Sequence, residues 1–233
     1  CIGPSFTVTL TIQPEPVVPF QSGDMACSDV AINVTLGNSN PFVSAFNITN
    51  IDANGLTASA GNPVTDDGLS DDEIKDDAWT NTTGMLKNVI YTVIPVSLVG
   101  CFGDFFTVTV QIKPEPVVTN QTAMTCSDVA LNFDLDALVS GAGDTYTYTV
   151  ASSDPTNVSA GADRVMASSV NITDSYTNTT GSDVTITYTV TPIGANDCVG
   201  NSFTVIVTVK PELVVTNQTA MTCSDVALNF DLD

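Results

Sequence analysis

The chain has 233 residues, of which 43% are hydrophobic and only 13% charged, and its 26 acidic and 5 basic residues give a net charge of −21. A surface this negative repels nucleic acid and anionic lipid, and no apolar run approaches the roughly 18 residues that span a membrane, so we expect neither nucleic-acid binding nor membrane insertion. The chain has no His, and it lacks P-loop and dinucleotide motifs, so we predict no enzymatic activity and no organic cofactor.

The first element, residues 1–18, returns at 101–118 and 198–215, and the second, residues 25–36, returns at 124–135 and 221–232. The stretch 117–136 is identical to 214–233 at all twenty positions. A period of about a hundred residues is typical of tandem domains. We therefore predict four parts and interpret the chain as an excerpt out of phase with its domains. These parts are the last strand of a preceding repeat at 1–17, whole repeats at 18–116 and 117–213, and the first strands of a following repeat at 214–233.

An acidic segment occupies residues 65–77, where seven carboxylates are close together: Asp66, Asp67, Asp71, Asp72, Glu73, Asp76 and Asp77. Oxygen ligands clustered in one loop are what Ca²⁺ requires, although the spacing is not that of an EF-hand. The corresponding residues 160–174 of the second repeat lack the cluster. The segment is either a calcium site of the first repeat or a solvated acidic loop.

The next repeated element is DAWTNTTG at 77–84 and DSYTNTTG at 174–181. Trp79, the only Trp, aligns with Tyr176, and we expect it to fill a core rather than stack on a sugar. Each of Asp29, Asp128 and Asp225 lies two residues after a Cys, where we expect a turn carboxylate that accepts backbone N–H groups. That role is favoured over an ion ligand between repeats.

The strands that follow have a periodicity of two. In 105–112, Phe106, Val108, Val110 and Ile112 alternate with polar residues, and 144–150, 184–190 and 203–209 behave similarly. Turn signals separate these short segments, and residues 71–79 permit at most a turn or two of helix. About seven strands per hundred residues predicts an all-β fold of tandem Ig-like antiparallel β-sandwiches. The prolines of 113–118 and 210–215 predict short, stiff connections, so the units should join end to end as a semi-rigid rod.

Six cysteines occupy two positions per repeat. The simplest pairing lies inside each unit, Cys27–Cys101 and Cys126–Cys198, with Cys1 and Cys223 bridged to neighbouring repeats. A rival pairing, Cys101–Cys126, would cross a boundary, but a ten-residue strand of about 33 Å leads away from Cys101. Free thiols in a reducing compartment are the remaining alternative.

The pattern C-x-G-x-x-F-T-V-x-V-x-x-x-P-x-P of residues 101–116, followed by Cys126–Ser127, resembles the PKD-like repeats of giant cell-surface proteins in Bacteroidota. The segments 80–83 with 91–95, and 177–180 with 188–192, also resemble that family. The resemblance implies Ig-like units, export by the type IX system and a role in adhesins, gliding-motility fibres or filaments. The chain departs from the family's common Cys-Ser-Gly because Asp29, Asp128 and Asp225 follow Cys-Ser.

Eight sequons provide candidate glycosylation sites: Asn33, Asn47, Asn81, Asn120, Asn157, Asn171, Asn178 and Asn217. We predict an extracellular structural repeat region that forms a stalk, adhesin shaft or surface filament. Its partners would be neighbouring copies or repeats of itself, through strand completion between units, or surface glycans and proteins. The alternatives are a Ca²⁺-dependent glycan- or protein-binding module, and an accessory region of a secreted enzyme.

Overall fold

The computed structural model describes residues 3–37, 42–138, 145–161, 164–165, 171–195, 197–213, 217 and 219–227. Within these residues the chain is all-β apart from the short 3-10 helix η1 (Asp136–Leu138), and no helix is long and apolar enough to cross a membrane. The segment 71–79 forms turns that lead into a strand. We call residues 18–116 unit 1 and residues 117–213 unit 2.

Unit 1 contains a five-stranded sheet and a two-stranded sheet. In the larger sheet β7 (Phe106–Lys113) lies between β6 (Lys87–Ser97) and the two short strands β1 (Gln21–Ser22) and β2 (Ala26–Cys27), and β3 (Val43–Asp52) forms the other edge. The smaller sheet pairs β4 (Thr57–Ala60) with β5 (Ala78–Thr80).

Unit 2 repeats the order of the long strands in its larger sheet, although its smaller sheet pairs other segments. Its larger sheet has the order β11 (Arg164–Val165), β10 (Thr145–Ser152), β13 (Val184–Ile193), β14 (Phe203–Lys210) and β8 (Gln121–Cys126). Its smaller sheet pairs β9 (Phe133–Asp134) with β12 (Asn171–Ile172). The tandem β-sandwich prediction is therefore confirmed.

One feature of the sheets differs from a purely antiparallel sandwich. The first strands β1 and β2 run parallel to the last strand β7, and β8 runs parallel to β14 in unit 2. The chain enters each unit at one end and leaves it at the other, so its first and last strands must point the same way. Because these two strands are also neighbours, they pair in parallel.

The apolar residues that alternate with polar ones in the sequence form the core, as predicted. Phe106, Val108, Val110 and Ile112 are at most 4% exposed, and they pack with residues of β3 and β6. Trp79 is buried in the same core, as predicted, and its Nε1 donates to the hydroxyl of Tyr91 (3.1 Å). Unit 2 has a separate core built in the same way from β10, β13 and β14.

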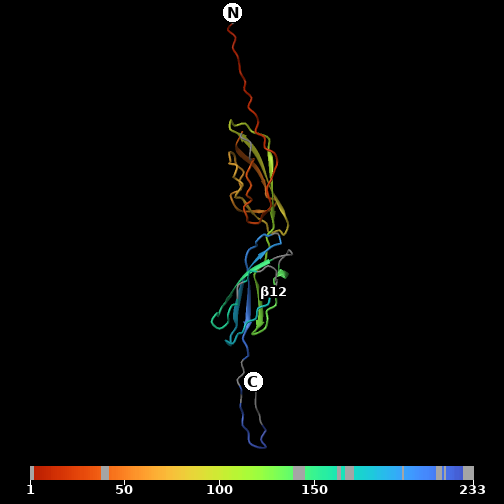
Figure 1. The fold of residues 1–233 in the computed structure, drawn as a ribbon, viewed down its shortest axis with the longest axis vertical. Coiled ribbons are helices and arrows are strands. Elements are labelled where there is room, and N and C mark those ends of the chain that lie inside the picture. Colours follow the sequence, from red (N-terminus) through yellow and green to blue (C-terminus); the bar gives the residue numbers. More distant parts are fainter. Residues whose placement is uncertain are drawn as a thin grey trace.

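The two units follow one another along the long axis of the molecule, with an extended N-terminal segment protruding from unit 1 (Figure 1). Residues 3–13 of this segment belong to no sheet among the described residues. Phe6, Val8, Leu10 and Ile12 correspond to the buried residues of β7, yet they are 79% to 86% exposed. The segment thus carries the pattern of a last strand without a sheet to cover it.

Candidate functional site: the joint between the units

The connection between the units is held from both sides. After β7 the chain runs through residues 113–116, and the Glu115 N–H donates to the Asn81 carbonyl of unit 1 (3.0 Å). On the other side, a Cβ atom at Gly200, in the loop between β13 and β14, would overlap the carbonyl oxygen of Pro116. Only Gly permits this close approach of two backbones. The proline segment is therefore packed against unit 2 rather than swinging free.

The same contact occurs at the far end of unit 1. A Cβ atom at Gly103, in the loop between β6 and β7, would overlap the carbonyl oxygen of Pro16. The Asp104 N–H also donates to Oε1 of Glu15 (3.1 Å). The segment that enters unit 1 therefore lies on its loop as the connection lies on unit 2. The close backbone contact is therefore the same at both places.

A disulfide crosses the joint and connects unit 1 to unit 2. Cys27, the last residue of β2, is bonded to Cys198 in the loop between β13 and β14, with the two Cα atoms 5.4 Å apart. Cys198 is fully buried. The bridge links residues 171 positions apart in sequence. It fixes the end of one sandwich to the start of the next.

The predicted pairings Cys27–Cys101 and Cys126–Cys198 are therefore wrong. Cys27 pairs with Lys113 at the end of β7, whereas Cys101 precedes the start of that strand. An eight-residue strand is about 26 Å long, so the two cysteines of one unit lie at opposite ends of it. Cys126 and Cys198 are separated by β14 in the same way.

The boundary-crossing rival, Cys101–Cys126, is also not formed. It placed the bridge at the joint but chose the wrong cysteine from each unit. Cys101, Cys126 and Cys223 are free thiols in the described part of the chain. Cys1 lies outside the described residues, and the bridging of Cys1 and Cys223 to neighbouring repeats stays a prediction.

A tight turn follows each first-strand cysteine. Asp29 and Asp128 adopt positive φ angles of 59° and 61°, the left-handed conformation that Gly adopts most easily. We expected backbone N–H donors, but the Asp29 carboxylate accepts from the Thr80 hydroxyl (2.6 Å), as Asp128 accepts from Thr177 (2.6 Å). Burial alone would raise the pKa of Asp29, but hydrogen bonds from Thr80 and from the side chains of Ser59, Ser28 and Glu115 outweigh it and lower that pKa.

Glu115 is a second acidic group at the joint. Its side chain is 5% exposed, and its Oε1 atom is buried with no hydrogen-bond partner among the described residues. Burial and then the charge of Asp29 raise the pKa of Glu115. The equivalent residue of unit 2, Glu212, is exposed. Glu115 is therefore a buried carboxyl group that lies close to the carboxylate of Asp29.

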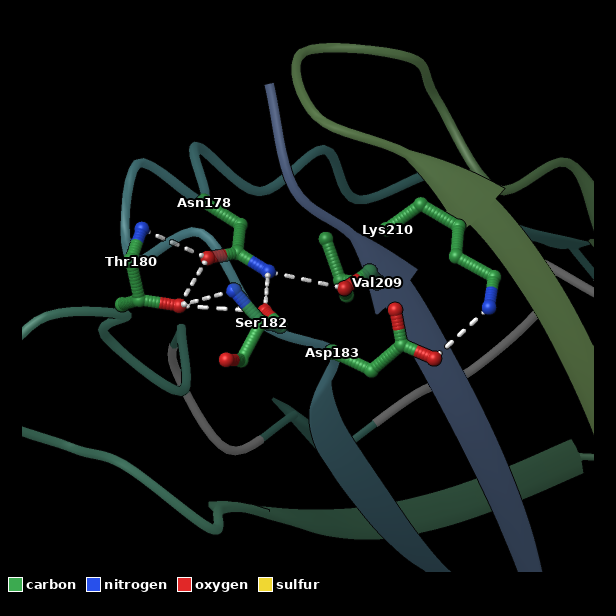
Figure 2. A network of polar contacts seen from close by, with 6 residues as sticks. All are labelled: Asn178, Thr180, Ser182, Asp183, Val209 and Lys210. Carbon is green, nitrogen blue, oxygen red and sulfur yellow. Dashed lines mark hydrogen bonds and ion pairs between the residues drawn. The ribbon is translucent and has the colours of Figure 1, made fainter. Parts of the chain in front are cut away.

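A fully buried Asn holds the turn beside each joint. The Asn178 amide nitrogen donates to the carbonyls of Ser182 and Val209 (both 2.8 Å), and its oxygen accepts from the N–H (3.1 Å) and hydroxyl (2.7 Å) of Thr180 (Figure 2). The nearby exposed ion pair of Lys210 and Asp183 contributes little by comparison.

Asn81 makes the same four bonds in unit 1, with Met85, Ile112 and Thr83. Sequence reasoning treated both Asn residues as sequons and missed this structural role. The sequence feature that could have revealed this role is the pentapeptide TNTTG, which is identical in the two units although most of the residues before it differ.

The family follows from these repeated units. Residues 24–116 and 123–213 each match the model of the PKD-like domain. The chain belongs to the PKD-like domain family. No curated protein sequence matches it significantly.

A comparison with solved structures finds several to which the chain is similar at low sequence identity and low TM-score. They include the fibronectin(III)-like modules of Clostridium thermocellum CbhA (12% identity, TM-score 0.28, 88% of this chain and 96% of that one covered) and human Protocadherin-24 EC1-2 (10%, 0.30, 87% and 100%). Chicken CNTN1 FN1-FN3 is similar at 11% identity, with a TM-score of 0.26 and 81% and 67% coverage. The family assignment rests on the PKD-like match.

The acidic residues of the first PKD-like unit do not converge. Asp77 is buried and accepts a hydrogen bond from the Tyr91 hydroxyl (2.8 Å), whereas Asp72, Glu73 and Asp76 line a shallow hollow together with Lys75. The carboxylates of Asp66, Asp67 and Asp71 lie on exposed residues. In the described part of the chain, no three acidic, Cys or His side chains are arranged to hold a metal ion. Calcium binding stays a prediction without a preformed site.

The sequons divide by exposure. Asn81 and Asn178 are completely buried with both amide hydrogens engaged, and Asn47 is buried with its oxygen accepting from the Gly68 N–H (2.9 Å). Glycosylation of Asn81 or Asn178 is incompatible with this fold, so those two predictions are wrong. The remaining five candidates are exposed and stay predictions: Asn33, Asn120, Asn157, Asn171 and Asn217.

Proposed function

We propose that the chain is a structural part of an extracellular stalk, adhesin shaft or surface filament, in which PKD-like units are stacked end to end. The observation that carries this proposal is the Cys27–Cys198 disulfide between the two units. A bridge at this position adds nothing to the interior of either sandwich. It restricts bending and separation at the joint, which is a mechanical task.

Further features of the joint support a rod. The Pro116 carbonyl packs on Gly200, and the Pro16 carbonyl packs on Gly103, so successive connections have the same close backbone contact. Proline also restricts the connection to extended conformations. Units joined by such a segment and by a covalent bridge keep one orientation from joint to joint.

The disulfide and the surface charge support a location outside the cytoplasm. Disulfides persist in oxidising surroundings and are rare where thiols are kept reduced. A net charge of −21 keeps long rods soluble and separate from one another. The resemblance to Bacteroidota surface proteins extends the proposal to a cell surface reached by the type IX system.

The partners we propose are neighbouring repeats or copies of the same protein. The N-terminal segment exposes Phe6, Val8, Leu10 and Ile12 where the equivalent residues of β7 and β14 are buried. In unit 1 the equivalent strand, β7, pairs with β6 and the first strands, and its apolar side chains pack in the core of the sandwich. Another unit of the same family provides such a sheet.

Electron cryotomography of the native cell surface tests this function, with labelling by an antibody against the two units. We expect labelled fibres with an axial repeat of about 40 Å, because the longest strand of a unit, β6, has eleven residues and spans about 36 Å. Label confined to isolated globular heads, or to the cell interior, would contradict the proposal.

A further inference from the structure

The disulfide creates a short covalent route through the molecule. A force that enters at the N-terminus passes along β1 and β2 to Cys27, crosses the bridge to Cys198, and leaves through β14. The chain between these two cysteines, residues 28–197, forms a closed side loop. It contains most of both sandwiches. No tension along this route can extend the side loop while the bridge is intact.

The two parts of this route are already extended and point the same way. β1 and β2 run parallel to β7, and β14 runs parallel to β8, so all of these strands follow the long axis from the N-terminal to the C-terminal end (Figure 1). The route crosses each unit once, through β1 and β2 in unit 1 and through β14 in unit 2. Because its strands are already extended, this route can lengthen only slightly under tension. We propose that the Cys27–Cys198 bridge diverts tension around the interiors of both units.

The repeat places Cys126 where the same bridge can form again. Cys126 ends β8 and pairs with Lys210, as Cys27 ends β2 and pairs with Lys113. The turn after each cysteine is held alike, because the Ser127 N–H donates to the Lys210 carbonyl at 3.0 Å and Ser28 does the same to Lys113 at 3.0 Å. Unit 2 therefore presents at its far end the half-joint that unit 1 presents to unit 2.

Cys101 forms the other half of such a joint. It precedes β7 as Cys198 precedes β14, on the loop that also carries Gly103. In the stacked array on which this step rests, Cys101 bonds the first-strand cysteine of a preceding unit, and Cys126 bonds the loop cysteine of a following unit. Each bridge forms when two thiols lose two protons and two electrons to a disulfide-type oxidant, which becomes a dithiol.

Bridges at every joint would produce two covalent paths along the rod. One path enters a unit through its first strand and leaves by the bridge, while the other arrives by a bridge and leaves through the last strand. In unit 2 these strands are β8 and β14, which are paired over six positions from Val205↔Gln121 to Lys210↔Cys126. The hydrogen bonds of this pair couple the two paths laterally.

Single-molecule stretching of the oxidised chain, held at its two ends through tags that contain no thiol, tests the diversion. In the reduced chain, unfolding should lengthen the tether by about 580 Å, because 171 residues extend by about 3.4 Å each. The oxidised chain should show no lengthening of that size before the tether breaks. Equal lengthening of the oxidised and reduced chains would overturn the proposal.

Matched substitutions identify the bridge responsible. Cys198→Ser should release the full lengthening under oxidising conditions, and Cys27→Ser should do the same, whereas Cys101→Ser and Cys126→Ser should leave the oxidised response unchanged. If bridges lay within the units, Cys101→Ser would instead release about 250 Å from unit 1 alone. That result would contradict the inferred route.

Thiol labelling of native fibres tests the extension to further joints. Alkylation before reduction should leave Cys101 and Cys126 unmodified, and their modification in intact fibres would contradict the two-path array. These outcomes are separable from the proposed function. Imaging can place the protein in fibres whatever the stretching experiment shows, and the stretching response of this chain does not depend on where the protein is located.

Discussion

Replacement of the buried Asn81 by Ala should strongly destabilise unit 1. The side chain makes four hydrogen bonds: Nδ2 donates to the carbonyls of Met85 (2.9 Å) and Ile112 (2.8 Å), and Oδ1 accepts from the N–H (3.1 Å) and hydroxyl (2.7 Å) of Thr83. A hydrogen bond contributes about 1 kcal/mol net, and Ala leaves buried partners unsatisfied. The expected loss is about 3–4 kcal/mol, a large part of the stability of a domain of this size.

The single Trp makes the measurement specific for one unit. Trp79 lies in the core of unit 1, so its fluorescence during denaturant unfolding of the reduced protein reports unit 1 alone. Asn81→Ala should move this transition to lower denaturant. The matched variant Asn178→Ala removes the same four bonds from unit 2 and should leave the Trp transition in place. A shift of less than 1 kcal/mol for Asn81→Ala would refute the role given to this side chain.

Three further outcomes are expected. Burial raises the pKa of Asp77 from 3.8 to about 6. Its protonated form therefore stabilises the fold below about pH 4, and this contribution is lost as the pH rises through 6. Asp77→Asn, followed by Trp fluorescence, should remove up to about 3 kcal/mol of this pH dependence. Burial and the charge of Asp29 also raise the pKa of Glu115, so its charged form destabilises the fold at pH 7. Glu115→Gln should therefore raise the melting temperature at pH 7, as measured by calorimetry. Glu212→Gln, at the exposed equivalent position, should leave the melting temperature unchanged. Millimolar Ca²⁺ should leave the melting temperature unchanged if the acidic segment is solvated, and a clear increase would establish the calcium site instead.

The architecture was accessible from the sequence because its signals are local or repeated. Alternation of two along 105–112 identified the residues of β7 that face the core, and it needed no knowledge of the neighbouring strands. The alignment of Trp79 with Tyr176 indicated a core position, since an aromatic residue occupies the same place in both repeats. Prolines at fixed places marked the ends of the units.

The disulfide was not accessible in this way, because its partners depend on strand direction. The simplest assumption, one bridge inside each unit, gives Cys27–Cys101. The parallel pairing of β2 with β7 puts Cys27 at the exit of unit 1 and leaves Cys101 near its entrance. Only this arrangement brings Cys27 to the loop of the next unit, where Cys198 lies.

The turns were misjudged for a related reason. Asn81 fits the sequon pattern as well as any exposed Asn, and only its position below the end of β7 makes it a buried partner of the Ile112 carbonyl. The hydroxyl partner of Asp29 is Thr80, which lies 51 positions away in sequence. Contacts of this range arise from the closing of the two sheets and leave no local signal.

Mapping of the disulfides by mass spectrometry tests the central claim most directly. The oxidised chain is alkylated, digested without reduction, and searched for cross-linked peptides. The joint described here predicts a peptide that contains Cys27 bonded to one that contains Cys198, with alkylated Cys101 and Cys126. Recovery of Cys27 bonded to Cys101, together with Cys126 bonded to Cys198, would show that the bridges lie inside the units and would contradict the covalent joint.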